Sequence, residues 1–187
     1  MPQQHRVCPW WIGFLLASPV RRLFQNPDRL LSPYVRPGMT VLEPGPGMGF
    51  FTLPLARMVG DGGSIHVIDV QQQMLDGLMR RARKAGLNGR IHPRLVKPES
   101  LGIADLAGSA DLVCAFAVVH EMPSAEGFFA EAASALKPGG VLLLAEPSGH
   151  VSAPDFAAEL EAAGRHGFRV TEHPEVRRSH VAVLRKS

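Results

Sequence analysis

Residues 41–52 read VLEPGPGMGFFT, an apolar run followed by an acid and three glycines at every second position. The apolar run predicts a buried strand that ends before the glycines. Gly45, Gly47 and Gly49 predict a tight turn, because glycine adopts backbone angles that other residues avoid and lets a ligand approach the main chain. A helix is expected directly afterwards, over residues 50–59, with its apolar side chains on one stripe. In such a strand–loop–helix unit, ligands bind beyond the carboxyl end of the strand.

The rest of the chain repeats this alternation of strand and helix. Strands are expected at residues 40–43, 64–70, 91–96, 111–119, 141–145, 168–172 and 181–184. Helices are expected at 50–59, 71–85, 124–136 and 155–163, and a loop with a short helix around 99–106. The alternation predicts an α/β fold with a doubly wound, mostly parallel sheet of seven strands. The last two strands are too close together to enclose a crossover helix. They should form an antiparallel pair, which gives the sheet an antiparallel edge strand.

The composition is that of an ordinary globular protein, with 45% hydrophobic and 20% charged residues in a chain of 187. Residues 38–187 carry the strand–helix pattern and are expected to form one domain. Residues 1–37 have no place in the sheet and are predicted to form an N-terminal helical lid segment. Its apolar stretch, residues 10–17, is too short to span a bilayer and only faintly resembles a signal peptide. With Cys8 and Cys114 forming no disulfide framework, we expect a cytoplasmic protein with no membrane partner.

The formal net charge of +3 is a modest positive excess. Its densest run, Arg80, Arg81, Arg83 and Lys84, falls near the expected end of a helix, where cations complement the helix dipole. We interpret this run as a solvated helix end, with an RNA or phosphate patch as the alternative. Nucleic acid is therefore not the favoured partner.

The spacing of the glycines separates the candidate ligands. A dinucleotide-binding loop of the form GxGxxG would need a third glycine at position 50, where this chain has Phe50. The Gly-Lys-Ser/Thr ending of a phosphate-binding loop is also absent. Glu43, at the end of the first strand, would repel a pyrophosphate and suits a cationic group. Asp69, at the end of the second strand, can accept hydrogen bonds from two ribose hydroxyls. A ribose joined to a cationic amino-acid tail indicates S-adenosylmethionine.

Four blocks of sequence extend this interpretation: VLEPGPGMGFFT at 41–52, IHVIDVQQQML at 65–75, ADLVCAFAVVHEMP at 110–123 and LKPGGVLLLAEP at 136–147. With them the chain resembles the class I S-adenosylmethionine-dependent methyltransferases from about residue 38 to its end. The resemblance implies a Rossmann-like methyltransferase fold with S-adenosyl-L-methionine as the cofactor. It further implies that the methionine moiety is lined by Glu43, Gly45, Gly47 and Gly49. Asp69 would hold the ribose, Val70 and Met74 would flank the adenine, and Phe116 would lie near the cofactor.

One part of the family pattern is missing. Many relatives carry an Asp after the third strand that binds the adenine amino group, whereas residues 96–101 here read VKPESL. The resemblance then implies that Glu99 or Ser100 takes over this contact, or that backbone groups around Leu101 do. All three are included among the expected cofactor contacts, and the choice between them stays open.

Polar residues follow the fourth and fifth strands at the edge where the cofactor is expected. His120 could take a proton from a hydroxyl or amine acceptor, with Glu121 orienting it or meeting the substrate. Glu146 and His150 are expected to contact the substrate. The alternatives are backbone binding or helix capping for His120 and loop stabilisation for Glu146 and His150. His120, Glu146 and His150 lack the spacing of a recognised metal site, so no metal is expected.

The acceptor is expected to be a small molecule. The Asn-Pro-Pro-Tyr-type signature of amino-directed nucleic-acid methyltransferases is absent after the fourth strand, and the blocks resemble those of quinone-biosynthesis and other small-molecule methyltransferases. Trp10 and Trp11 are predicted to wall the substrate site, with plain packing against the domain as the alternative, and a homodimer is left open. Two rival functions remain: a nicotinamide-dependent oxidoreductase, which Phe50 disfavours, and a non-catalytic S-adenosylmethionine-binding module.

Overall fold

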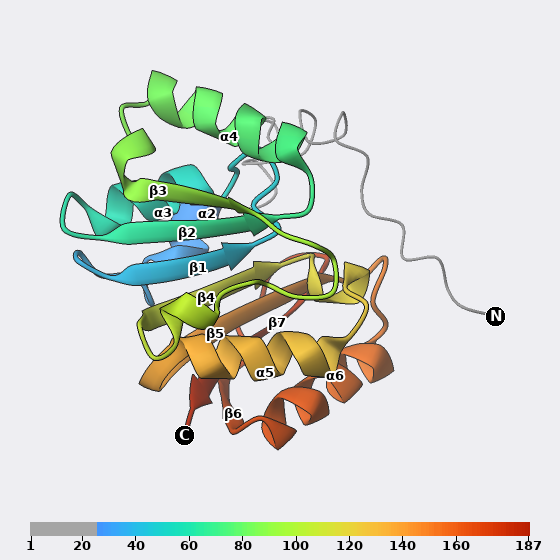
Figure 1. Ribbon diagram of the computed structural model, residues 1–187. Helices are drawn as coiled ribbons and strands as arrows, with labels where there is room; N and C mark the ends of the chain where they lie inside the picture. The colour runs from blue at the N-terminus through green and yellow to red at the C-terminus, as the bar shows by residue number, and fades with distance from the viewer. Residues whose placement is uncertain (1–25) are drawn as a thin grey trace.

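The computed structural model describes residues 26–187, and their strands form a seven-stranded sheet (Figure 1). The strands are β1 (Thr40–Pro44), β2 (Ser64–Asp69), β3 (Ile91–Leu95), β4 (Ala110–Phe116), β5 (Leu136–Pro147), β6 (Phe168–Glu172) and β7 (Ser179–Lys186). Their order is β3-β2-β1-β4-β5-β7-β6. β1 to β5 run parallel, and β7 lies antiparallel between β5 and β6. The predicted α/β fold, the parallel sheet and the antiparallel pair at one edge are confirmed, with β6 as the outermost strand of that pair.

Helices cover both faces of the sheet. One face carries α2 (Pro27–Leu31), α3 (Thr52–Val59) and α4 (Gln72–Lys84), and the other carries α5 (Ala125–Ala135) and α6 (Ala153–Arg165) (Figure 1). Three single 3-10 turns complete the described elements: η2 (Asn88–Arg90), η3 (Ala104–Leu106) and η4 (Val119–Glu121). Ser124 caps α5, because its hydroxyl accepts a hydrogen bond from the Gly127 amide at 3.0 Å.

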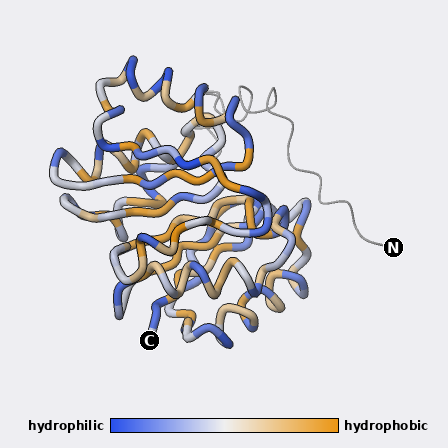
Figure 2. The backbone as a smooth tube through the Cα atoms, in the orientation of Figure 1, coloured by the Kyte–Doolittle hydropathy of each residue, from blue (hydrophilic) through white to orange (hydrophobic). Residues whose placement is uncertain are grey.

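The central strands are buried on both sides, as their continuous apolar sequences predict. Along β5, Leu142 and Leu144 pack in the cluster beneath α5 and α6. Leu143 and Ala145 pack in the opposite cluster, beneath α2, α3 and α4. Figure 2 shows hydrophobic residues concentrated on the central strands and polar residues on the outer surfaces of the helices. By the same alternation, the side chain of Glu146 lies on the side of α5 and α6.

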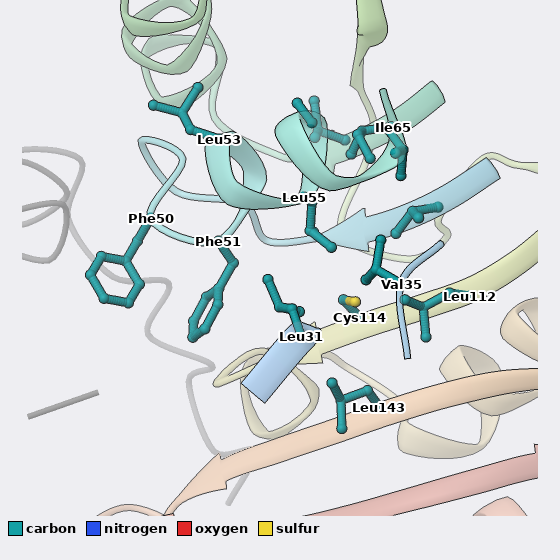
Figure 3. Close-up of a cluster of buried hydrophobic side chains, with 14 of the residues drawn as sticks. Leu31, Val35, Phe50, Phe51, Leu53, Leu55, Ile65, Leu112, Cys114 and Leu143 are labelled. Carbon is teal, nitrogen blue, oxygen red and sulfur yellow. The ribbon is translucent and has the colours of Figure 1, made fainter. Parts of the chain in front are cut away.

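The cluster beneath α2, α3 and α4 extends to the loop that precedes α3. There the rings of Phe50 and Phe51 meet edge to face, with centroids 5.0 Å apart, and Phe51 packs near Leu31 of α2 (Figure 3). Leu31 and Val35 are buried in this cluster, although the sequence pattern assigned them to the segment before the domain. The described end of that segment thus contributes to the domain core.

Two predicted strand boundaries differ from the structure by more than two residues. β4 stops at Phe116 and not at residue 119, because Ala117 adopts a left-handed φ of 54°. β5 begins at Leu136 and not at residue 141, because Leu136 already pairs with Ala110 of β4. The short helix expected around residues 99–106 is the turn η3, which follows Gly102 and its left-handed φ of 61°.

Within residues 26–187 no helix combines the length and the apolarity needed to cross a bilayer. Trp10 and Trp11, which the sequence predicts to wall the substrate site, lie outside this described range. Cys114 is a buried free cysteine in β4, as its apolar sequence context suggests.

Candidate functional site

A cavity of about 500 Å³ opens at the carboxyl ends of the parallel strands, where the strand order reverses between β1 and β4. Its walls come from the loop after β1, the end of β2, the loop after β3, the region from the end of β4 through η4, α5, and the loop after β5. Most residues that the sequence singles out line it, namely Glu43, Gly45, Gly47, Asp69, Val70, Met74, Glu99, Ser100, Leu101, Phe116, His120, Glu121 and His150. Gly49 and Glu146 are not part of the cavity wall.

The glycine loop forms the wall beside β1, and its three glycines have different tasks. A Cβ at Gly45 would lie 2.6 Å from a methyl group of Val118, and a Cβ at Gly49 would collide with Leu78. These two glycines are therefore required by packing. Gly47 has a left-handed φ of 53° and lines the cavity, and a Cβ there would meet no protein atom within 4 Å. Gly47 is the glycine that leaves room for a ligand.

Glu43 brings a buried carboxyl to this cavity. It is 2% exposed, and its Oε2 has no hydrogen-bond partner among the described residues. Burial raises the pKa of Glu43 to about 8, and the neighbouring Thr52 side chain opposes this rise. A buried carboxyl without a partner is costly. A bound cationic group would supply the missing partner.

Asp69 ends β2 next to the glycine loop, which is held there by a hydrogen bond from the Gly45 amide to the Ile68 carbonyl at 2.8 Å. Asp69 Oδ1 accepts a hydrogen bond from the Gln71 amide at 2.9 Å, at the point where the chain turns into α4. Burial raises the pKa of the Asp69 carboxyl to about 6, and the amides of Gln71 and Val70 oppose the rise. The site thus holds two acids at the ends of adjacent strands.

His120 and Glu146 form a hydrogen-bonded pair where β4 and β5 end. Nδ1 of His120 is bonded to Oε2 of Glu146, and Oε1 of Glu146 accepts a hydrogen bond from the Val119 amide at 2.9 Å. The bond to Glu146 raises the pKa of His120, while burial opposes the rise. The His120 side chain is 19% exposed and lines the cavity, with the ring of His150 edge-on at 5.8 Å.

The predicted substrate contact of Glu146 needs correction. Its side chain is fully buried and lies outside the cavity wall, because the alternation along β5 turns it toward α5 and α6. Glu146 reaches the cavity only through the ring of His120.

The cavity combines a buried carboxyl with one unpartnered oxygen, a glycine that leaves room for a ligand, and a second acid at the end of the neighbouring strand. These groups fit S-adenosylmethionine, which carries an amino group, a sulfonium and a ribose. A profile of the methyltransferase domain family matches residues 41–140, more than half of the chain. The chain belongs to the class I S-adenosylmethionine-dependent methyltransferase family.

Similar proteins agree with this membership. The chain is 34% identical to a ribosomal protein L11 methyltransferase of Pelotomaculum thermopropionicum over 140 residues, which are 73% of this chain and 41% of the relative. It is 31% identical to a ubiquinone biosynthesis O-methyltransferase of Paramagnetospirillum magneticum over 139 residues, 74% of this chain and 51% of the relative. The chain spans about half the length of these curated relatives.

A solved structure shows the same fold over nearly the whole chain. The crystal structure of an S-adenosylmethionine-dependent methyltransferase from Aquifex aeolicus superimposes with a TM-score of 0.84 at 23% identity. The match covers 96% of this chain and 98% of that one. The Rossmann-like methyltransferase fold implied by the sequence is therefore confirmed.

Glu131 also lines the cavity, and the sequence interpretation missed it. It lies on α5, and its carboxylate accepts hydrogen bonds from the Leu101 amide at 3.0 and 3.1 Å and from the Ser100 hydroxyl at 3.0 Å. A signal was present, because Glu131 follows Phe128 by three residues and shares its helix face. Phe128 is buried and also lines the cavity, so a charged residue on this face marks a polar site.

Glu159 of α6 was also missed. It is half-buried, and its Oε2 has no hydrogen-bond partner among the described residues. Burial raises the pKa of Glu159 to about 7, the charge of Glu146 adds to the rise, and His120 opposes it. The strand register agrees with this proximity, because Glu146 pairs with His180, whose ring stacks on Phe156, one turn before Glu159. No linear motif signals this arrangement, which requires α6 to fold back over the end of β5.

Proposed function

We propose that this protein transfers the methyl group of S-adenosylmethionine to a small-molecule acceptor in the cavity beside His120. The observation that carries the proposal is the buried carboxyl of Glu43, which lines the cavity next to the glycine loop and whose Oε2 has no hydrogen-bond partner among the described residues. A cationic amino-acid tail would satisfy that carboxyl, whereas a pyrophosphate would be repelled by its ionised form. Glu43 therefore favours S-adenosylmethionine over a dinucleotide, and Asp69 fits the ribose that both ligands carry.

In this proposal the cofactor lies across the ends of β1 and β2. Glu43 binds the amino group of the methionine moiety, and Gly47 leaves the space for that moiety. Asp69 accepts hydrogen bonds from the ribose, and Val70 and Met74 border the adenine. When bound, S-adenosylmethionine supplies a methyl group that the positive charge on sulfur has already activated. The protein therefore has mainly to align the acceptor and exclude water.

His120 acts as the base for an acceptor that carries a proton. Its Nδ1 is engaged by Glu146, which leaves Nε2 to take up the proton. Glu146 holds this tautomer and stabilises the imidazolium that forms, so it is a positioning residue. Glu121 and His150, which line the same cavity, are proposed to contact the acceptor.

A small-molecule acceptor is supported by the similarity to a ubiquinone biosynthesis O-methyltransferase. The cavity wall agrees, because Phe51 and Phe116 line it with ring centroids 4.1 Å apart and offer an apolar surface for a flat molecule. Trp10 and Trp11 stay a prediction as further walls of this site. A protein acceptor is the second candidate, because a ribosomal protein L11 methyltransferase is 34% identical over 73% of the chain.

The proposal is tested by incubating the protein with S-adenosylmethionine and pools of acceptors, and by measuring S-adenosylhomocysteine by mass spectrometry. Hydroxylated aromatic compounds form one pool, and ribosomal proteins form the other. Product that requires an aromatic compound, and that His120→Ala abolishes, supports the proposal. Product with ribosomal proteins alone would favour the second candidate. A protein that binds no S-adenosylmethionine in calorimetry would refute the cofactor assignment.

A further inference from the structure

Glu131 of α5 places a carboxylate on the wall of the cavity, beside the loop after β3. The loop after β3 presents the Leu101 amide and the Ser100 hydroxyl on this side, and both donate to the Glu131 carboxylate at 3.0 to 3.1 Å. These two donors are therefore already used. What lines the cavity here is the half-buried carboxylate itself, which is an acceptor of hydrogen bonds.

The loop is also held by contacts that do not involve Glu131. The Arg94 guanidinium bonds both carboxylate oxygens of Asp105 at 2.7 Å and also donates to the Gly102 carbonyl. The Gly102 amide donates to the Ser100 hydroxyl at 2.9 Å. A bidentate arginine pair of this kind is geometrically specific. Contacts other than those of Glu131 therefore hold the loop in place, so positioning the loop does not depend on Glu131 alone.

The carboxylate has capacity for a further donor. An ionised carboxylate offers about four acceptor positions. The bonds from Leu101 and Ser100 leave room for a donor that enters from the cavity. Apolar side chains border the same cavity, namely Phe128 of α5 itself, Val70 after β2 and Met74 of α4. An apolar slot with an acceptor at its rim suits a flat heterocycle that carries an amino group.

The strand connections place this acceptor close to the ribose position of the proposed function. Asp69 ends β2, and its carbonyl accepts a hydrogen bond from the Val96 amide at 3.0 Å, at the start of the loop that contains Leu101. A base attached to a ribose at Asp69 would therefore extend along this loop toward α5. This step rests on the proposed function, because it takes Asp69 as the ribose site.

We propose that Glu131 is the residue by which this protein selects a base with an exocyclic amino group, as adenine has, over one with an oxo group. An amino group donates to the carboxylate. An oxo group would set two acceptors against each other, and the carboxylate would lose its partner. A site built to hydrogen-bond an N–H discriminates strongly against an analogue that lacks it. Glu131 thereby replaces the acid that the loop after β3 lacks.

The test compares S-adenosylhomocysteine with its deaminated analogue S-inosylhomocysteine by calorimetry. In the analogue an oxo group replaces the exocyclic amino group, and the neighbouring ring nitrogen N1 carries a proton. The wild-type protein should bind the amino ligand roughly tenfold to a hundredfold more tightly. In Glu131→Gln the side-chain amide can donate to the oxo group, so the ratio should fall toward one. In Glu131→Ala the ratio should also fall. Glu99→Gln tests the other acid that the sequence offers for this contact, and it should keep the wild-type ratio if Glu131 is the selecting residue.

The ratio of the two affinities shows whether Glu131 selects the base or only holds the loop in place. A loop that is only loosened by the loss of Glu131 would bind both ligands more weakly and keep their ratio, which would overturn the inference. A wild-type ratio near one would overturn it without any variant, and so would a ratio that collapses in Glu99→Gln alone. Failure of wild-type protein to bind S-adenosylhomocysteine at all would instead contradict the proposed function.

Discussion

Glu146 accepts a hydrogen bond from the backbone amide of Val119 at 2.9 Å, in addition to its bond with His120. One buried carboxylate therefore fixes both the backbone of η4 and the imidazole that projects from it. The bond to the amide anchors the turn, and the bond to the ring sets its tautomer. Because the two oxygens have separate tasks, the charge and the shape of Glu146 can be tested separately.

Glu146→Gln keeps the shape of the side chain and removes its charge. We expect the pKa of His120 to fall, because the hydrogen bond to Glu146 is the main cause of its raised value. NMR titration of the imidazole measures this shift without any acceptor. With an acceptor in hand, kcat should fall roughly tenfold to a hundredfold while cofactor affinity stays the same. An unchanged titration of His120 would contradict the positioning role.

Cofactor binding should release a proton from Glu43. Its carboxyl has a pKa of about 8 in the free protein, so it is largely protonated at pH 7, and a cationic group beside it would favour the ionised form. Calorimetry at pH 7 in buffers of different ionisation enthalpy counts this proton. Glu43→Gln should release less and should bind roughly tenfold to a hundredfold more weakly. The cofactor's own amino group contributes equally in both proteins, so the difference in released protons is the contribution of Glu43. Equal release from both proteins would show that the proton comes from another group.

The parts of the site that were predictable from sequence are those whose geometry is local. The spacing of the glycines after β1 sets their conformations directly, and Asp69 is marked by its place at a strand end. Glu131 and Glu159 act on residues of other elements, so their roles depend on how α5 and α6 pack on the sheet. The misplaced Glu146 has a similar cause, because its burial follows from the face of β5 on which it lies. Ala117 ends β4 with a left-handed φ, which alanine rarely adopts, so the end of the strand could not be predicted from the sequence.

Gly47→Ala should mainly weaken ligand binding, whereas Gly49→Ala should mainly lower the stability of the fold. Both positions have a left-handed φ, 53° and 86°, which costs an alanine roughly 1–2 kcal/mol. At Gly49 the added Cβ also collides with Leu78, so we expect a total loss of about 3 kcal/mol or more. At Gly47 the added methyl group has space in the free protein, so the loss of stability should be smaller, but affinity for S-adenosylhomocysteine should fall at least about tenfold. Denaturant unfolding and calorimetry measure the two quantities. Wild-type affinity in Gly47→Ala would remove that residue from the cofactor wall.

Asp69→Ala should weaken the binding of S-adenosylhomocysteine roughly a hundredfold, because the ribose would lose hydrogen bonds to a charged acceptor. The variant should remain folded, since the Gln71 amide that it leaves behind lies at the start of a helix, where water or the ligand can reach it. Asp76→Ala, an exposed position on the same helix, serves as the control. Equal affinities of the two variants would refute the ribose assignment.

Glu159→Gln should change how stability depends on pH. The pKa of Glu159 rises from 4.5 to about 7 on folding, chiefly through burial and then through the charge of Glu146. The folded protein therefore holds this proton more tightly than the unfolded chain. The stabilising contribution is complete below pH 4.5 and is lost as the pH rises through 7. Glutamine mimics the protonated form, so the Tm of Glu159→Gln relative to wild type should increase between pH 5 and pH 8.

Glu161→Gln, an exposed change on the same helix, is the control and should follow the wild-type curve. Glu43 titrates in the wild type and in both variants, so its effect cancels in the Tm differences. A Tm difference that stays constant with pH would mean that Glu159 is already ionised in the folded protein and does not sense Glu146.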